Sequence, residues 1–239
     1  MLPTRPMLPI TLHHHYDFGA DRGLVGDDLI RPEAWDALRI QSSGPFALPA
    51  QRDAWVAAAD IPALRMRAEA LSRSLDELGV VRMASYGVGT AGLELWLHRL
   101  APARQLVVTE YAPETVARLA QNFQGVEVRA HDLLADPPLE AELHLFHRVD
   151  TEFDNQQWRA ILGRFAGARV LLIAAEILGP GALLNEIRTR LTRRAASRAG
   201  WLRNRAGFRT LWRTTHAATP VRFADLDGWL LTPIRRGPA

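Results

Sequence analysis

Short apolar runs alternate with helical patterns between residues 61 and 175, and this alternation constrains the fold more than any other feature. The runs that predict strands are residues 80–86, 105–110, 126–130, 143–149 and 169–175. Amphipathic helical patterns separate them, for example over residues 113–123, where a proline opens the helix. Strands that alternate with helices form a mostly parallel sheet covered on both faces. We therefore predict a doubly wound α/β domain.

The two ends of the chain depart from this pattern. Residues 1–60 are rich in proline and glycine, which predicts an irregular, partly helical segment that covers the main domain of residues 61–239. Near the C-terminus we predict a long helix over residues 183–198. Its expected buried stripe is Leu183, Leu184, Ile187, Leu191 and Ala195. Residues 208–216 and 227–233 are too close together for a helix between them, which predicts an antiparallel hairpin.

A glycine-rich turn, GVGTAG, follows the first predicted strand of the main domain. Gly87 and Gly89 allow the backbone to turn tightly and to approach a ligand where a Cβ atom would clash. The amides that open the next helix face the same place. Glu110 closes the next strand, 23 residues after Gly87, where a carboxylate can accept hydrogen bonds from the two hydroxyls of a ribose. These residues predict a binding site for a nucleoside-containing cofactor.

Composition excludes several classes of protein. The 239-residue chain, 48% hydrophobic, can bury one large core. It has no cysteine, so disulfides, zinc-thiolate sites and cysteine nucleophiles are excluded. Without an apolar run of about 18 residues or a signal-peptide pattern, we expect a cytoplasmic protein with no membrane partner. His13, His14 and His15 are adjacent and therefore point in different directions, which favours a surface or cleft-lining loop over a metal site. The loop of residues 16–28 is an alternative candidate for a cofactor or substrate contact.

In this order of elements the chain resembles the class I, Rossmann-like methyltransferases that depend on S-adenosylmethionine. The resemblance covers residues 63–233 and implies a seven-stranded sheet that ends in a C-terminal antiparallel hairpin. The family's first motif is an acidic residue followed by three glycines at alternate positions. Gly87 and Gly89 match the first two glycines, Ala91 stands at the third, and Ser85 stands at the acidic position.

The resemblance also implies a set of site residues and a reaction. Glu110 matches the ribose-binding acid, and Tyr111, Asp132 and Leu133 match positions that contact adenine. The full set of expected cofactor-binding residues is Tyr86, Gly87, Gly89, Glu110, Tyr111, Asp132, Leu133, Phe146, His147 and Arg148. Direct transfer of a methyl group to an oxygen or nitrogen of a small molecule is the expected reaction. A base is needed only if the acceptor atom carries a proton; His147 is then the first candidate, before His131 and His216.

Three alternatives remain open at this stage. GVGTAG also matches the GxGxxG pattern of NAD(P)-dependent oxidoreductases, although the hairpin after a single sheet disfavours that class. An RNA methyltransferase would hold phosphates with arginines of residues 188–213 and stack bases on Trp201 and Trp212. All 29 basic residues are arginine and twelve of them follow Glu186, but an ordinary solvated surface is the preferred interpretation. Ser85 and Ala91 also permit a non-catalytic binding module. No pattern sets the oligomeric state.

Overall fold

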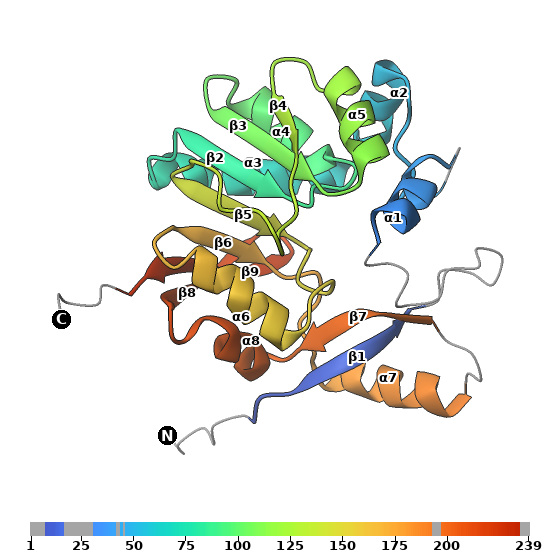
Figure 1. The fold of residues 1–239 in the computed structure, drawn as a ribbon, viewed down its shortest axis with the longest axis vertical. Coiled ribbons are helices and arrows are strands. Elements are labelled where there is room, and N and C mark those ends of the chain that lie inside the picture. Colours follow the sequence, from blue (N-terminus) through green and yellow to red (C-terminus); the bar gives the residue numbers. More distant parts are fainter. Residues whose placement is uncertain (1–7, 17–30, 42–43, 45, 193–196, 235–239) are drawn as a thin grey trace.

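A seven-stranded sheet forms the centre of the protein (Figure 1). The structure is a computed structural model that describes residues 8–16, 31–41, 44, 46–192 and 197–234. In spatial order the strands are β4 (Glu127–Ala130), β3 (Gln105–Glu110), β2 (Arg82–Tyr86), β5 (Leu143–His147), β6 (Val170–Ile173), β9 (Leu226–Pro233) and β8 (His216–Phe223). The first five are parallel, and β9 is antiparallel to both of its neighbours. The predicted Rossmann-like α/β fold with a C-terminal antiparallel hairpin is therefore confirmed.

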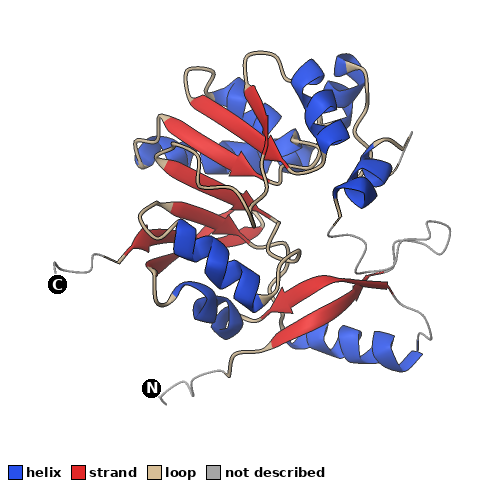
Figure 2. Cartoon of the chain, in the orientation of Figure 1, coloured by secondary structure: helices blue, strands red, loops and turns tan. Residues whose placement is uncertain are grey.

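Helices cover both faces of this sheet (Figure 2). On one face, α3 (Pro62–Glu77), α4 (Gly92–Leu100) and α5 (Pro113–Asn122) enclose one hydrophobic core, and on the other, α6 (Asn155–Arg164) and α8 (Arg205–Trp212) enclose a second. The central strands are buried on both faces, which explains why their sequences are continuous apolar runs. Asp154 caps α6 by accepting hydrogen bonds from the backbone N–H groups of Gln156 and Gln157.

The N-terminal segment contains more regular structure than the sequence indicated. Strand β1 (Thr11–Tyr16) includes the three histidines and pairs with β7 (Ser197–Arg203) in a two-stranded antiparallel sheet, beside α7 (Pro180–Thr192). The prediction of a histidine loop is therefore wrong. Helices α1 (Pro32–Arg39) and α2 (Arg52–Ala58) pack on α5, and α2 also contacts α4. Residues 17–28 of the candidate contact loop lie outside the described part of the chain.

Asp36 explains how α1 is attached. Its carboxylate accepts hydrogen bonds from the backbone N–H groups of Glu114 and Thr115 and from the Thr115 hydroxyl, at 2.8–3.1 Å. A carboxylate at a helix N-terminus satisfies free amides and interacts favourably with the helix dipole. A residue of the N-terminal segment thus caps a helix of the main domain.

Two predicted elements near the C-terminus are wrong. Residues 208–216 were expected to be a strand, but residues up to Trp212 belong to α8; the hairpin is formed by β8 and β9 instead. The helix expected over residues 183–198 ends at Thr192, and Leu184, Ile187 and Leu191 are 69%, 47% and 81% exposed. The expected stripe is therefore not buried at these three positions, and Ala195 is not described. No helix among the described residues is long and apolar enough to cross a membrane.

Candidate functional site

A hollow lies where β2, β3 and β4 end. Parallel α/β sheets bind ligands at the carboxyl ends of their strands, and this hollow occupies that edge. Its lining residues are Gly87, Glu110, Tyr111, His131, Asp132, Leu133, Leu134, Val149, Glu152 and Phe153. We refer to it below as the β2–β4 hollow.

The turn between β2 and α4 takes the conformation that its glycines predict. Gly87, Gly89 and Ala91 all have positive φ, at 61°, 59° and 52°. A Cβ atom on Gly87 would lie 2.6 Å from a methyl carbon of Val149, across the hollow's wall. Gly87 is therefore needed both for its backbone angle and for close packing. Ala91, at the position of the third glycine, adopts the same left-handed conformation despite its side chain.

Glu110 lies at the end of β3 and faces this turn. Its Oε2 accepts a hydrogen bond of 2.7 Å from the Gly89 backbone N–H, and its Oε1 accepts one of 2.9 Å from Tyr111. A carboxylate has about four lone-pair positions, so each oxygen keeps one for a ligand hydroxyl. The two protein bonds fix the orientation of the carboxylate without using up its capacity to bind.

An acid also lies close to Ser85, the residue at the family's acidic position. The Ser85 hydroxyl donates a hydrogen bond of 2.7 Å to Oε1 of Glu94, from the first turn of α4. Both side chains are buried, and burial raises the pKa of Glu94 to about 7. Position 85 carries no carboxyl group itself, but Glu94 of the following helix places one beside it.

The loop between β5 and α6 forms the opposite wall of the hollow. Glu152 lines it, and burial, followed by the nearby charge of Glu110, raises the pKa of Glu152 to about 8. The positive charge of Arg39, the last residue of α1, acts in the opposite direction and lowers the pKa of Glu152. Asp150 is fully buried and accepts a hydrogen bond of 2.6 Å from the Ala175 backbone N–H; burial raises its pKa to about 6.

Arg203, in β7, holds this loop in place. Its buried guanidinium donates to the carbonyl oxygens of Asp150 and Phe153 and to Oδ1 of Asn155, at 2.5–2.7 Å. The backbone N–H of Trp201 also donates to the Thr151 carbonyl, at 2.7 Å. The small sheet therefore positions a wall of the hollow.

Five of the ten expected cofactor-binding residues line the hollow: Gly87, Glu110, Tyr111, Asp132 and Leu133. Gly89 contributes by donating to Glu110. Tyr86 and Phe146 are fully buried beneath the hollow, in the core on the α6 side. Arg148 is exposed just after β5.

His147 does not line the hollow. Its Nε2 is buried and forms no hydrogen bond with any described residue. Burial, followed by the charges of Arg148 and Arg67, lowers the pKa of His147 to about 3, which makes it a weak base. His131 does line the hollow, with its ring edge-on to Tyr86 at 5.0 Å, and burial lowers its pKa. His216 lies within 3.2 Å of two carbonyl oxygens, those of Phe165 and Ala168, as a structural contact.

Sequence reasoning missed Val149, Glu152 and Phe153, which line the hollow, and Arg39, whose guanidinium lies beside Gly89. Glu152 lies in the loop that follows the parallel strand β5, and this position was a usable signal. No local pattern pointed to Arg39. Among the described residues, no group of three or more histidine, aspartate or glutamate side chains could hold a metal ion.

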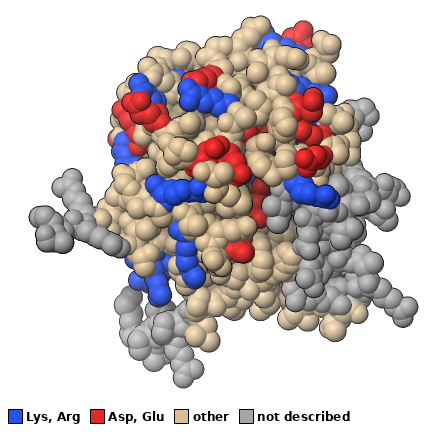
Figure 3. Space-filling view, viewed as in Figure 1, with Lys and Arg blue, Asp and Glu red and all other residues tan. Residues whose placement is uncertain are grey.

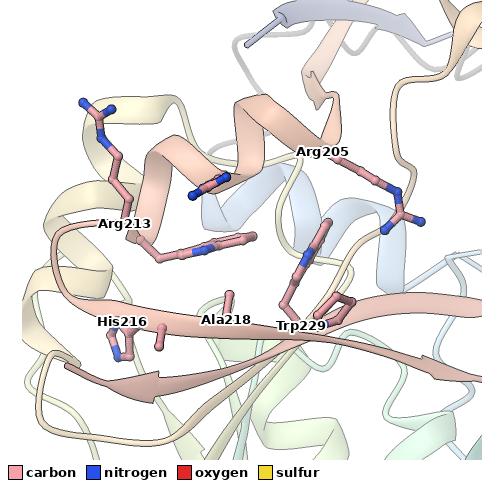
Figure 4. Close-up of a pocket in the computed structure, with 9 residues that line it drawn as sticks. Arg205, Arg213, His216, Ala218 and Trp229 are labelled. Carbon is pink, nitrogen blue, oxygen red and sulfur yellow. The ribbon is translucent and has the colours of Figure 1, made fainter. Parts of the chain in front are cut away.

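A second hollow lies between α8 and the strands β8 and β9 (Figure 4). Its lining residues are Arg205, Arg209, Trp212, Arg213, His216, Ala217, Ala218, Pro220 and Trp229. In the space-filling view, basic side chains gather over α6 and α8, whereas acidic side chains lie along the middle of the same face (Figure 3). We refer to this second cavity as the α8 hollow.

Comparison with solved structures identifies the fold. The sequence matches no family model and no curated protein. Human N-acetylserotonin methyltransferase in complex with SAM aligns over 77% of this chain and 56% of its own, with a TM-score of 0.57 and 19% identity. TnmH aligns over 84% and 61%, with a TM-score of 0.59 and 18% identity. CalO1, a methyltransferase in calicheamicin biosynthesis solved with SAH bound, aligns over 69% and 52%, with a TM-score of 0.52 and 22% identity.

These similarities establish that the chain has the fold of S-adenosylmethionine-dependent methyltransferases. The chain spans only 52–61% of the length of these three structures. The order of its seven strands, with the antiparallel β9 between β6 and β8, also differs from the order of dinucleotide-binding folds. The structural evidence thus disfavours the oxidoreductase alternative.

Proposed function

We propose that this protein is an S-adenosylmethionine-dependent methyltransferase that acts on a small molecule. The observation that carries the proposal is the β2–β4 hollow, where Glu110 is fixed by two backbone amides beside the glycine turn. The free lone pairs of Glu110 suit the ribose hydroxyls, and Asp132 and Leu133 line the adjoining wall, where they would contact adenine. The absence of a side chain at Gly87 lets Val149 pack closely against the turn at this hollow.

When bound, S-adenosylmethionine supplies an electrophilic methyl group, so the protein contributes mainly orientation and exclusion of water. If the acceptor atom carries a proton, we assign its removal to Glu152 rather than to His147. Glu152 lines the hollow, and its pKa of about 8 is close enough to neutrality for reversible proton exchange. The weak basicity of His147 and its position away from the hollow argue against the original candidate.

Ligand-dependent stability tests the cofactor assignment. A ligand that binds only the native state, at 100 times its dissociation constant, stabilises that state by about 2.7 kcal/mol. We expect S-adenosylmethionine and S-adenosylhomocysteine to raise the melting temperature, and NAD and NADP to leave it unchanged. A shift with a nicotinamide cofactor alone would overturn the proposal.

Substitutions of Glu110 test whether S-adenosylmethionine binds in the β2–β4 hollow. Glu110→Gln, which keeps one carboxyl-like oxygen for the backbone amides, should weaken binding of S-adenosylmethionine, and Glu110→Ala should abolish the shift. Glu114→Ala, at an exposed glutamate in the next helix, is the matched control and should bind normally. Transfer of a labelled methyl group to a panel of phenols and amines then separates an enzyme from a non-catalytic binding module.

Nucleic-acid binding is the second candidate function, and the α8 hollow is the observation that favours it. Arg205 is 3.4 Å from Asp227, whereas the guanidinium groups of Arg209 and Arg213 have no ionic partner among the described residues. Trp212 is only 3% exposed, so its ring has little surface on which a base could stack. The candidate therefore rests on phosphate contacts rather than on the expected stacking.

Fluorescence anisotropy with a single-stranded RNA tests this candidate. An RNA-binding site predicts that affinity falls steeply as salt increases, and that the double variant Arg209→Glu, Arg213→Glu removes binding. Binding of S-adenosylmethionine by that variant should be unchanged. Absence of RNA binding by the wild-type protein at low salt would eliminate the candidate.

A further inference from the structure

Arg39 places a guanidinium directly over the glycine turn. It is the last residue of α1, and its Nη2 atom lies 2.5 Å from the position that a Cβ atom on Gly89 would occupy. The absence of a side chain at Gly89 is what gives the guanidinium this space. The backbone N–H of the same glycine donates to Glu110. Gly89 therefore lies between the ribose-binding carboxylate that we propose and a half-buried cation.

The hydrogen-bonding capacity of Arg39 is largely unused. Its Nη1 donates to the Phe46 carbonyl at 3.1 Å, and its guanidinium packs on the rings of Trp35 and Phe46 at 5.1 and 5.8 Å. The Nε atom is buried and has no hydrogen-bond partner among the described residues, and none of their acidic side chains lies within ion-pair distance of the guanidinium. A guanidinium offers five N–H donors, so most of them remain available.

Such an arrangement is costly unless an anion completes it. Burial lowers the pKa of Arg39, and the charges of Glu110 and Glu152 only partly oppose this effect. A cation that is largely removed from water is normally paired, because its lost hydration is otherwise not replaced. Carboxylates match the planar fork of arginine and can accept two parallel hydrogen bonds from it.

We infer that Arg39 binds the carboxylate of the amino-acid part of S-adenosylmethionine, and so makes the site selective for this cofactor over its decarboxylated form. The inference rests on the proposed function. The amino-acid part is attached through sulfur to the 5′ carbon of the ribose, and Gly89 is the residue in contact with both Glu110 and the Arg39 guanidinium. The ribose and the carboxylate are thus held on two sides of one glycine.

Protein contacts fix the position of Arg39. Three residues before it, Asp36 caps α5 and so ties α1 to the main domain. The Leu48 backbone N–H, after the turn that follows α1, donates to the carbonyl of Arg39 itself, at 2.8 Å. The N-terminal segment therefore holds the Arg39 side chain in place beside the glycine turn. This favours binding, because the side chain loses little conformational entropy when an anion binds.

Calorimetric titration of the full-length protein with four compounds tests the inference. The compounds are S-adenosylmethionine, decarboxylated S-adenosylmethionine, S-adenosylhomocysteine and methylthioadenosine; the first and third carry the carboxylate, and the other two lack it. Wild-type protein should bind the carboxylated members of this set more tightly. Arg39→Met, which keeps an unbranched side chain between Trp35 and Phe46, should weaken S-adenosylmethionine by about 10- to 100-fold and decarboxylated S-adenosylmethionine by less than about twofold.

Arg118 provides a matched control. Like Arg39, it donates to a backbone carbonyl of the N-terminal segment, that of Leu48 at 2.9 Å, but the atoms next to the missing side chain of Gly89 are those of Arg39 and not of Arg118. Arg118→Met should not change the ratio of the two affinities. Arg39→Lys, which keeps the charge but loses the fork, should retain part of the selectivity.

The titrations distinguish a failure of the proposed methyltransferase function from a failure of the proposed role of Arg39. If the wild-type protein binds none of the four compounds, the proposed function fails and this inference fails with it. If it binds S-adenosylmethionine and the decarboxylated compound equally, only the role of Arg39 is overturned, whether or not Arg39→Met folds. Equal weakening of both compounds by Arg39→Met would also overturn it. Selectivity that is lost in Arg39→Met and retained in Arg118→Met supports it.

Discussion

At the residue scale, the site depends on backbone angles as much as on side chains. Gly87, Gly89 and Ala91 all lie in the left-handed region, so Ala91 takes a backbone conformation that normally favours glycine. Left-handed φ costs a non-glycine residue roughly 1 kcal/mol, which the complete burial of the Ala91 methyl group in the α3–α4 core offsets. The departure from the family motif is therefore tolerated without a change in geometry.

Glu152 gives a pH-dependent prediction. Because its pKa is raised from 4.5 to about 8, the folded protein keeps a proton there that the unfolded chain releases. Stability should then fall as the pH rises between these two values, by at most about 1.4 kcal/mol per pH unit, and this decrease should end above pH 8. Glu152→Gln cannot release a proton, so its advantage over the wild-type protein should increase from pH 5 to pH 8.

Urea unfolding of both proteins at each pH unit from 5 to 9 measures this difference. Glu114→Gln, at an exposed glutamate, is the control and should follow the wild-type curve. A constant difference between Glu152→Gln and the wild-type protein across this range would show that Glu152 titrates normally, and would remove it as the candidate base.

The sequence predicted those site residues that follow parallel strands, because the carboxyl ends of such strands meet at one edge of the sheet. Glu110 was found in this way, Asp132 was implied by the family resemblance, and both line the hollow. His147 was misplaced because adjacent strand residues face opposite sides: Phe146 packs in the α6 core, whereas the charge of Arg67, from α3, acts on His147. Arg39 lies 50 residues before Gly89 in the sequence, and only tertiary packing brings the two together.

At the element scale, the C-terminal errors have identifiable causes. Phe208, Leu211 and Trp212 recur at helical spacing, and Asn204 caps α8 by accepting a hydrogen bond from the Gly207 N–H. The strand was predicted instead because residues 208–216 and 227–233 are too close together for a helix between them. In α7 the leucines were assumed to face inward, but apolar side chains also contribute much of a normal protein surface. The exposed Leu184 and Leu191 are an example.

The exposure of Leu191 can be tested by truncation. Because its side chain is 81% exposed, Leu191→Ala should change the free energy of unfolding by less than about 0.5 kcal/mol. Leu75→Ala removes a fully buried side chain of α3 and should cost about 2–5 kcal/mol. Urea unfolding measures both. A cost for Leu191→Ala comparable to that of Leu75→Ala would return this residue to the buried stripe that its spacing first predicted.

At the scale of the whole molecule, a strand near the N-terminus, β1, pairs with a strand of the C-terminal part, β7. The order of the central strands followed from local patterns, since each strand and helix is encoded by its own segment. The pairing of β1 with β7 did not follow, because it joins residues 181 to 192 positions apart and neither strand has a distinctive pattern. Through Arg203, this pairing also supports the loop that carries Glu152.

Asn204 is the residue on which the final prediction depends. Its Oδ1 accepts hydrogen bonds from the N–H groups of Ile10 and Gly207, at 3.0 and 2.7 Å, and its Nδ2 donates to the Leu8 carbonyl at 2.8 Å. Asn204→Ala removes a helix cap and leaves the Ile10 amide without its partner, so we expect a loss of about 2 kcal/mol of stability. Asn204→Asp keeps the acceptor and loses only the donor, which should cost about half as much.

Hydrogen exchange distinguishes a local effect from a general loss of stability. In Asn204→Ala the amides of residues 8–16 should exchange faster than the rest of the protein, because β1 loses its attachment to the start of α8. Asn122→Ala, which removes a single hydrogen bond between α5 and the Pro49 carbonyl, is the control and should leave those amides protected. Uniformly faster exchange throughout the chain in Asn204→Ala would contradict this prediction. It would mean that the β1–β7 sheet unfolds only together with the whole domain and not as a local unit.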